Sequence, residues 1–392
     1  MLERIKELSN KINNEVIDIF NYLHENPELS FKEFNTSKYI KDYLDSLNIK
    51  YESPTDTSVV ALINGDSTGK TIAFRCDMDA LPIEEDSSHV ICSKNNGIMH
   101  ACGHDFHMAA LLGTAKILNS IKSELKGNIL LIFQAGEELL PGGAKQIIET
   151  DIFNKYQTEW IGAFHCDPAL PSGTAGFKEG MYMASGDEVF ITIKGEGGHA
   201  AMPHETADTV LIASEIIVAL QQINSRHCPP SIPSVLTFGK IIGNGAVNII
   251  PKEVKIDGTF RTMNEEWRAK AKELIKTIAN SIAESHGAKC HVNIVDGYPF
   301  LTNDKEYTKK LKEIAIMHLG KENIHDLDIR MTTEDFAYYS QVMKSTFFRL
   351  GVGEKDKINH ALHTAGFKAN DSTLKIATSL ITDICIRSLQ GF

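Results

Sequence analysis

The spacing of apolar residues changes twice along the chain, and this constrains the fold more than any other feature of the sequence. In the first part, short apolar stretches that predict strands alternate with stretches of helical periodicity. The predicted strands are apolar on both faces, as expected for a sheet buried between layers of helices. The predicted helices cover 16–23, 40–47, 105–118 and 143–149, and the predicted strands cover 58–63, 71–75, 128–133 and 160–164.

The middle of the chain follows a different order of elements. A strand with alternating apolar residues precedes a helix, two strands, a second and longer helix, and a last strand. This β-α-β-β-α-β order is that of a ferredoxin-like α+β sandwich. The predicted elements, in chain order, are 188–194, 207–223, 234–241, 253–260, 265–286 and 289–295.

The first pattern then returns, with helices predicted over 305–318 and 372–389 and a strand over 346–350. The expected fold class is therefore α/β, with one domain inserted into another. We expect a discontinuous α/β domain, in which helices surround a mostly parallel sheet, and an inserted ferredoxin-like α+β domain. The predicted limits are 1–183 and 296–392 for the discontinuous domain and 184–295 for the inserted one.

Charge and composition exclude several classes of protein. Forty lysines and arginines against 51 acidic residues give the 392-residue chain a net charge of −11 without any basic run, which argues against a nucleic-acid partner. No apolar run reaches the roughly 18 residues that a membrane-spanning helix needs. Charges throughout the first helix predict that there is no signal peptide. Seven widely spaced cysteines without a CxxC pair predict reduced thiols and a cytoplasmic protein.

A histidine-rich segment precedes the helix predicted at 105–118. It reads His-Ala-Cys-Gly-His-Asp-Phe-His, and Cys102 and His104 are separated only by a glycine. A thiolate and an imidazole that turn toward one ion suit zinc, manganese, cobalt or nickel better than magnesium or calcium. The alternative interpretation is a buried cysteine beside a histidine and an aspartate that cap the helix.

Two adjacent glutamates, Glu137 and Glu138, directly follow the strand predicted at 128–133. Side chains converge at the carboxyl end of a buried strand, so one carboxylate could bind a metal ion while the other takes a proton from water. In most surface loops such a pair is only solvated charge. Asp79 follows the strand at 71–75 and could hold a ligand imidazole by its free N–H, or could belong to a polar turn.

Two histidines occupy comparable positions. His165 follows the strand predicted at 160–164, and His363 lies between the last strand and the last helix. Together with the preceding clusters they supply one cysteine, three histidines and a glutamate, which suits two ions that share a bridging ligand. A competing interpretation makes Cys102 the nucleophile of a thiol protease, but it leaves the glutamates and these histidines without a role.

The inserted domain carries weaker signals. Its first strand is followed by a glycine-dense segment, 195–204, which contains His199 and could let the backbone approach a ligand closely. Asn248 and Arg261 flank the strand predicted at 253–260. An arginine at a strand end can pair with a carboxylate through two hydrogen bonds.

In this combination the motifs resemble those of the aminoacylase-type metallopeptidases. The branch concerned contains hippurate hydrolases, auxin–amino acid conjugate hydrolases and N-acetyldiaminopimelate deacetylases. The resemblance covers nearly the whole chain, although Ala135-Gly136 stand where the family often has Pro-Ala. It rests on segments 23–30, 74–82, 99–107, 133–138, 197–201, 248–251, 258–262 and 334–336, with His165 and His363.

The resemblance implies a catalytic function for the discontinuous domain and two divalent metal ions per subunit, zinc or manganese, with cobalt or nickel as further possibilities. The inserted domain would be a lid and dimerisation domain, which makes a homodimer the expected assembly. The resemblance assigns five residues as metal ligands, namely Cys102, His104, Glu138, His165 and His363, and it assigns Asp79 as support for a ligand imidazole. Glu137 would be the general base and acid, and His199 would be an oxyanion-stabilising group that can reach a partner subunit's site. Asn248 and Arg261 would bind the substrate carboxylate.

The activity implied by the resemblance is hydrolysis of the amide bond of N-acyl-L-amino acids, as in hippurate hydrolase. Such a reaction releases a carboxylic acid and a free amino acid. A carboxypeptidase or dipeptidase of the same family, acting on short peptides, is an alternative. A catalytically silent binding protein is another, which the presence of Glu137 and of all five ligand types disfavours.

Overall fold

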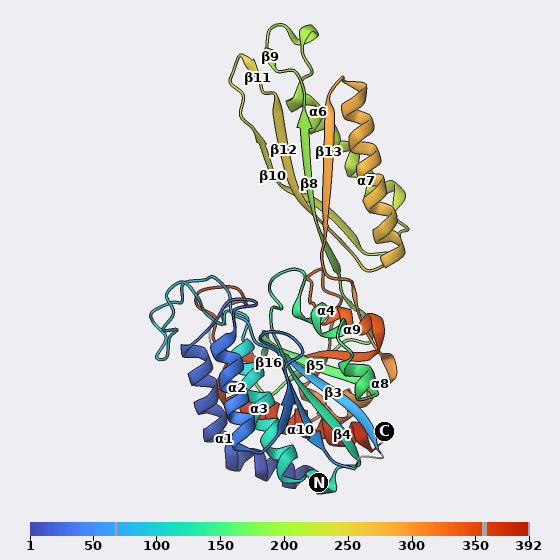
Figure 1. Cartoon of the computed structure of the whole chain (residues 1–392). Coiled ribbons are helices and arrows are strands. Elements are labelled where there is room, and N and C mark those ends of the chain that lie inside the picture. The colour runs from blue at the N-terminus through green and yellow to red at the C-terminus, as the bar shows by residue number, and fades with distance from the viewer. Residues whose placement is uncertain (67–68, 355–358, 391–392) are drawn as a thin grey trace. The chain divides into compact units, whose positions relative to one another are not determined.

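The computed structural model describes residues 1–66, 69–354 and 359–390. The chain forms two compact units, coloured by residue number in Figure 1. The first unit comprises Met1–Tyr182, Thr302–Ile329 and Asp335–Phe392, and the second comprises Met183–Leu301 and Arg330–Glu334. The assignment of 1–183 and 296–392 to a catalytic domain, and of 184–295 to a lid, remains a prediction.

The first unit is built on an eight-stranded sheet in the order β1-β2-β4-β3-β5-β16-β6-β15. Its centre is parallel, because β3 pairs in parallel with β4 and β5, and β5 pairs in parallel with β16. The predicted α/β fold with a mostly parallel sheet is thus confirmed. The strands are β1 Lys50–Glu52, β2 Val59–Asn64, β3 Lys70–Asp77, β4 Gly127–Gln134, β5 Thr158–Pro171, β6 Ala175–Phe177, β15 Ile324–Asp326 and β16 Lys344–Gly353.

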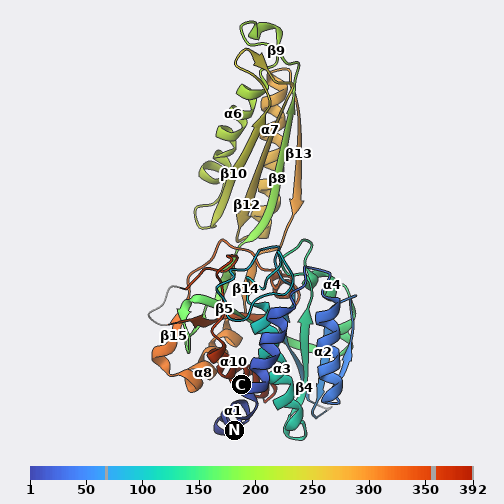
Figure 2. The ribbon, with the colours of Figure 1, turned by 90° about the vertical axis from the view of Figure 1, so that its left-hand side faces the viewer.

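Two helices pack on this sheet, and a third helix packs on top of them. The helices α3 (His104–Ser120) and α10 (Leu374–Leu389) pack against the sheet, and α1 (Leu2–Glu25) packs against both of them (Figure 2). Because α3 is covered from both sides, nearly all of its residues are buried. The remaining helices of this unit are α2 Phe34–Ser46, α4 Gly143–Ile148, α5 Ile152–Lys155, α8 Lys305–Leu319 and α9 Ala337–Val342.

The second unit contains a four-stranded antiparallel sheet in the order β10-β12-β8-β13. Alternate residues of β8, such as Val189 and Ile191, pack against apolar side chains of the two helices, including Ile216 and Ile275. The element order along the chain is β-α-β-β-α-β. The elements are β8 Ser185–Lys194, α6 Thr209–Leu220, β10 Ser234–Gly243, β12 Glu253–Thr262, α7 Glu265–Ser285 and β13 Lys289–Asp296.

Four short strands complete the fold. A small antiparallel ribbon joins β9 (Gly198–His199) to β11 (Ile249–Ile250) in the second unit. The strands β7 (Gly180–Met183) and β14 (Leu301–Asn303) lie where the chain passes from one unit to the other. No helix among the described residues has an apolar stretch long enough to cross a membrane.

The difference from the predicted elements that matters most for the candidate site concerns β5. Its predicted range was 160–164, but the strand continues to Pro171 because β16 pairs with it along most of that length. His165 therefore lies within a strand and not after its end. The helix α3 also begins one residue earlier than predicted, so that His104 is its first residue.

Candidate metal centre

The parallel centre of the sheet brings several of the predicted site residues to one edge. The carboxyl ends of parallel neighbours lie side by side, so the segments that follow β3 and β4 and the middle of β5 are adjacent. Asp79 follows β3, the Glu137-Glu138 pair follows β4, and His165 belongs to β5. The segment before α3 adds Cys102.

Three of the predicted ligands surround the Cys102 sulfur. Its Sγ lies 3.2 Å from His165 Nε2 and 3.3 Å from His363 Nε2. The same His363 nitrogen lies 3.1 Å from Glu138 Oε1. The cluster is open on one side, because the His363 side chain is 52% exposed while Cys102 and His165 are buried. The cluster therefore faces solvent on the side where His363 lies.

The fifth predicted ligand, His104, is held from behind. Its Nδ1 donates a hydrogen bond of 2.8 Å to the backbone carbonyl of Asp79, which leaves Nε2 as the ligand atom. That Nε2 is buried and has no hydrogen-bond partner. The Asp79 carboxylate in turn accepts hydrogen bonds from Ser30 Oγ and from the backbone N–H of Glu138. Asp79 therefore connects two predicted ligands.

The protonation of His165 fits metal binding, whereas, against the effect of burial, the nearby carboxylates raise the pKa of His104 to about 10, so that a bound ion would have to displace its proton. His165 Nδ1 donates to the Cys166 carbonyl at 2.7 Å, and burial together with Arg349 holds the pKa of His165 well below its usual value, so its Nε2 is free to bind. Burial and the Glu138 and Glu137 carboxylates raise the pKa of the Cys102 thiol. A bound cation would reverse this effect, since a coordinating thiol loses its proton.

The residues present therefore fit a metal centre. Cys102, His104 and His165 form one group whose ligand atoms lie within 4.8 Å of one another, and Cys102, Glu138 and His363 form another. The sulfur belongs to both groups. Nitrogen, sulfur and carboxylate donors suit zinc and its neighbours among the transition metals. The role of each residue as a ligand remains a prediction.

His107 lies beside this cluster but has another task. Its Nδ1 donates to Asp77 Oδ1 at 2.6 Å, and its Nε2 accepts the backbone N–H of Cys166 at 2.9 Å. Both ring nitrogens are thereby used within the protein. His107 therefore fixes the strand that carries His165, and sequence reasoning did not assign it this function.

A buried ionic network supports the same edge of the sheet and was missed in the sequence. Arg75 Nη1 donates to Asp77 at 2.8 Å, and Arg75 Nη2 donates to Asp335 at 2.7 Å. Gln134 donates to Asp335 at 2.7 Å and accepts from Arg75 Nε. Burial opposes ionisation of Asp77, but His104, His107 and Arg75 hold its pKa well below the usual value. The motifs at 74–82 and 334–336 contained these residues without revealing that they pair.

The loop that carries Glu137 is fixed by its backbone. Gly136 has a φ of +62°, which favours glycine, and the Phe31 ring occupies the space where a Cβ would lie. The Gly136 N–H donates to Glu33 Oε1 at 2.8 Å, and the Ala135 N–H donates to Ser58 Oγ. Glu137 itself is 7% exposed. These bonds give the predicted base a defined position.

One predicted ligand, His363, and the glycine between two others have left-handed backbone conformations. Gly103 has a φ of +80°, and a Cβ there would overlap the Cys166 sulfur. His363 has a φ of +62° although it is not a glycine, and its N–H donates to the Ala101 carbonyl at 2.8 Å. Glycine adopts such a conformation freely, but at His363 it costs of order 1–3 kcal/mol, and such strain concentrates at functional sites.

The predicted oxyanion-stabilising residue, His199, and the two predicted substrate-binding residues, Asn248 and Arg261, lie in the second unit. His199 is exposed in β9 and pairs with Ile249 of β11, and Asn248 precedes that strand. Arg261 lies near the carboxyl end of β12, whereas Asn248 lies before the strand begins, and Arg261 Nε donates to Thr259 Oγ1. The structure thus brings His199 and Asn248 together but separates Arg261 from both.

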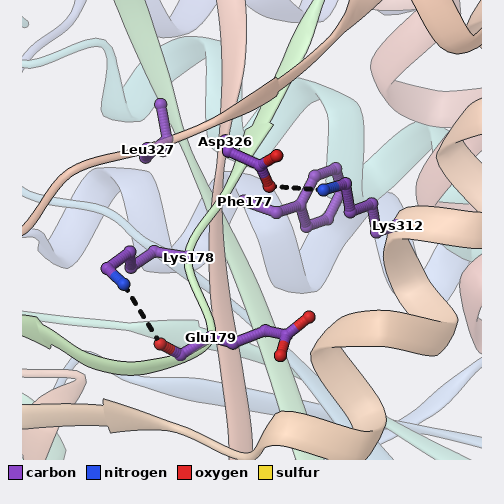
Figure 3. A pocket seen from close by; sticks show the side chains of 6 residues that line it. All are labelled: Phe177, Lys178, Glu179, Lys312, Asp326 and Leu327. Atoms are coloured by element: carbon purple, nitrogen blue, oxygen red, sulfur yellow. Dashed lines mark hydrogen bonds and ion pairs between the residues drawn. The ribbon is translucent and has the colours of Figure 1, made fainter.

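A pocket of about 270 Å³ lies elsewhere in the first unit and contains none of the predicted site residues (Figure 3). Phe177, Lys178 and Glu179 follow one another on one side of it, and Lys312 forms an ion pair with Asp326 across it. Lys178 donates a hydrogen bond to the backbone carbonyl of Glu179, so both lysines of this pocket are held by protein atoms.

Comparisons with known proteins agree with this geometry. A family model described as Peptidase family M20/M25/M40 matches residues 73–387. Thermostable carboxypeptidase 2 of Saccharolobus solfataricus is 36% identical over 381 residues, 96% of each chain. An N-acyl-L-amino acid amidohydrolase of Geobacillus stearothermophilus is 40% identical over 305 residues, 78% of this chain and 82% of that one. The crystal structure of a Bacillus subtilis protein described as a dinuclear metal-binding peptidase has a TM-score of 0.82 at 31% identity, covering 98% and 100% of the two chains.

The fold and the cluster of potential metal ligands at its sheet edge are those of a hydrolase of the M20 type, a class in which a similar solved structure is described as a dinuclear metal-binding peptidase. The chain belongs to the peptidase family M20/M25/M40, since the family model covers most of its length and relatives above 30% identity match nearly all of it. The family expected from the sequence motifs is therefore confirmed, and so is the assignment to the amidohydrolases within it.

Proposed function

We propose that the protein hydrolyses the amide bond of N-acyl-L-amino acids and releases a carboxylic acid and a free amino acid. The observation that carries this proposal is the position of Glu137. It directly precedes Glu138 in a fixed loop, and its carboxylate contributes to the pKa shift of the Cys102 thiol. A carboxylate beside a cluster of metal ligands has the position that a general base needs.

The metal ions, zinc or manganese in this proposal, would be held by Cys102, His104, Glu138, His165 and His363. When bound, they would polarise the scissile carbonyl and make water more acidic. Glu137 takes the proton of the attacking water and returns it to the leaving amine. His199 donates a hydrogen bond to the oxyanion, and Asn248 and Arg261 bind the carboxylate of the substrate.

A homodimer is part of this proposal. Arg261 lies near the end of β12, and Asn248 lies before the strand begins at Glu253; from Glu253 to Arg261 the strand extends roughly 26 Å at about 3.3 Å per residue. One chain cannot place both groups on the same small carboxylate at that separation. Two chains can, if Asn248 and His199 of one chain serve the partner. The seven free cysteines support a reducing compartment, and we propose the cytoplasm.

The runner-up is a carboxypeptidase or dipeptidase. The similarity to a thermostable carboxypeptidase, at 36% identity over nearly the whole chain, favours it over a binding protein without activity. The two activities differ in whether the group on the carbonyl side of the scissile bond is a simple acyl group or an amino-acid residue with a free amine. A panel of N-acetyl amino acids, N-benzoyl amino acids and dipeptides distinguishes them.

The test is the variant Glu137→Gln, assayed with that panel and with metal content measured on the same samples. We expect turnover to fall by roughly 10²- to 10⁴-fold or more, the contribution of a general acid and base, while both metal ions are retained. The exposed Glu149 provides a matched control, and Glu149→Gln should retain full activity.

Two results would contradict the proposal. Full turnover in Glu137→Gln would show that another group is the base. Metal binding by the wild type without turnover on any substrate would favour a binding protein. If dipeptides were hydrolysed faster than every N-acyl amino acid, a carboxypeptidase or dipeptidase activity would replace the proposed one.

A further inference from the structure

A second group of potential ligands lies in the first unit, and none of its members belongs to the predicted centre. His24 is in the last turn of α1, and Glu85 and His89 are in the long segment between β3 and α3. His24 Nε2 lies 2.8 Å from Glu85 Oε1, and His89 Nδ1 lies 2.7 Å from the same oxygen. Two imidazole nitrogens from separate segments thus converge on one carboxylate.

The second ring nitrogen of His24 makes the contact that is typical of a metal-binding histidine. Its Nδ1 lies 2.7 Å from Asp105 Oδ2, in the first turn of α3. Histidines that bind metals typically donate their other N–H to a carboxylate, which fixes the ring and the tautomer. With Asp105 as acceptor, His24 Nε2 is directed at Glu85.

The backbone holds the group in place. The His89 N–H donates to the Asp86 carbonyl at 3.2 Å, and the Ser88 N–H donates to Asp86 Oδ1, so a turn folds His89 back over Glu85. The second carboxylate oxygen of Glu85 accepts the Ser93 N–H at 2.6 Å. A backbone turn therefore positions His89, and the Ser93 N–H fixes the carboxylate of Glu85.

Burial and charge also suit a cation. The side chains of His24 and Glu85 are 3% and 4% exposed, and that of His89 is 13% exposed, so an ion would enter from the His89 side. Glu85 and Asp105 together supply two negative charges, which a divalent ion would neutralise. A purely structural ion pair would need only one imidazole at this carboxylate.

We propose that His24, Glu85 and His89 form a further divalent-metal site, distinct from the dinuclear centre, for zinc or a similar borderline cation. The ligand atoms are His24 Nε2, Glu85 Oε1 and His89 Nδ1, which lie within 4.8 Å of one another. Two imidazoles and a carboxylate leave a fourth position for water, as in zinc sites with three protein ligands.

The ion competes with a proton. Burial opposes protonation of His24, but Asp105 and Glu85 raise its pKa to about 9, so in the absence of metal a proton occupies this position. Binding of the ion releases that proton, and zinc uptake becomes more favourable as the pH rises. Zinc loading is therefore best carried out at about pH 8.

The experiment counts zinc in the full-length protein after dialysis against micromolar zinc, by mass spectrometry of the metal. Wild type should hold one more zinc ion per chain than His89→Ala. A matched control is His286→Ala, which removes a surface histidine paired with Glu215 at 2.9 Å in the second unit and should bind as much zinc as wild type. The difference between variants is independent of how many ions the dinuclear centre holds.

Equal zinc content in wild type and a folded His89→Ala would overturn the proposal. Circular dichroism shows whether the variant is folded, and removal of His89 leaves the buried Asp105–His24–Glu85 contacts intact. Should His89→Ala not fold, Glu85→Gln decides in its place, because glutamine retains an acceptor for Ser93. Loss of one zinc ion in Glu85→Gln would support the site, and an unchanged content would refute it.

Discussion

Glu33 shows how strongly its surroundings can change a single residue. It is completely buried, and its carboxylate accepts hydrogen bonds from the N–H groups of Phe31 and Gly136 and from Thr57 Oγ1. Burial, followed by the negative charge of Asp79, raises its pKa to about 7. Gly136 directly precedes the predicted base, Glu137, and donates its N–H to Glu33. The protonation state of Glu33 therefore affects a hydrogen bond in the loop that contains the predicted base.

This shift predicts how stability depends on pH. The folded state keeps the proton of Glu33 up to about pH 7, whereas the unfolded chain loses it near 4.5, so the folded state is destabilised as the pH rises between these values. The full effect approaches about 3 kcal/mol. In Glu33→Gln this contribution is absent. Urea unfolding of the metal-free protein at about pH 5 and about pH 8 should therefore show a larger loss of stability in wild type.

The exposed Glu124, paired with Arg4, provides a control for this measurement. Glu124→Gln should follow the pH dependence of wild type. An identical pH dependence in wild type and in Glu33→Gln would mean that Glu33 is ionised throughout and that the environment favours its charge.

At the scale of secondary structure elements, β3 combines two kinds of ion pair. Arg75 is fully buried between Asp77 and Asp335, whereas Lys70, at the start of the same strand, pairs with Glu159 at the surface. A buried pair whose partner is removed leaves an uncompensated charge, and an exposed pair contributes little. The strand therefore allows both cases to be compared within one element.

We expect Arg75→Met to lower the free energy of unfolding by about 3–5 kcal/mol, because Asp77 and Asp335 would lose their shared buried cation. Lys70→Met should cost less than about 1 kcal/mol. Chemical denaturation of both variants tests this difference. Similar, small losses in the two variants would show that the network beneath the metal centre tolerates the loss of its arginine.

The elements also show which part of the site was accessible from the sequence. Apolar periodicity and strand ends placed Glu137 and Glu138 correctly after β4, because these signals are local. The extent of β5 was underestimated, because the pairing with β16 that lengthens it joins residues far apart in the chain. The contacts of Arg75 with Asp335 and of His107 with Cys166 were invisible for the same reason.

At the scale of the whole molecule, the second unit is incomplete as an isolated surface. The strand β10 is an edge of its sheet, with its outer backbone groups unpaired within that sheet. Ile241 and Ile242 of this strand are 50% and 40% exposed, and Val218 of α6 is 72% exposed. Apolar side chains beside an open edge are typical of a surface that pairs with another chain. Because β12 lies between Arg261 and the segment that carries Asn248, the partner proposed above is a second copy of the same chain.

The double variant Ile241→Lys, Ile242→Lys tests this assembly. Both side chains are exposed, so the fold should persist while two like charges prevent the edges of two chains from pairing. Sedimentation velocity should give twice the chain mass for wild type and a single chain mass for the variant. Val342→Lys, a change at an exposed valine of the first unit, should leave the dimer intact.

Because His199 and Asn248 are proposed to serve the partner, the monomeric variant should also lose turnover while keeping its metal ions. If the wild type were monomeric at all concentrations and fully active, both the proposed dimer and the proposed site shared between two chains would be contradicted.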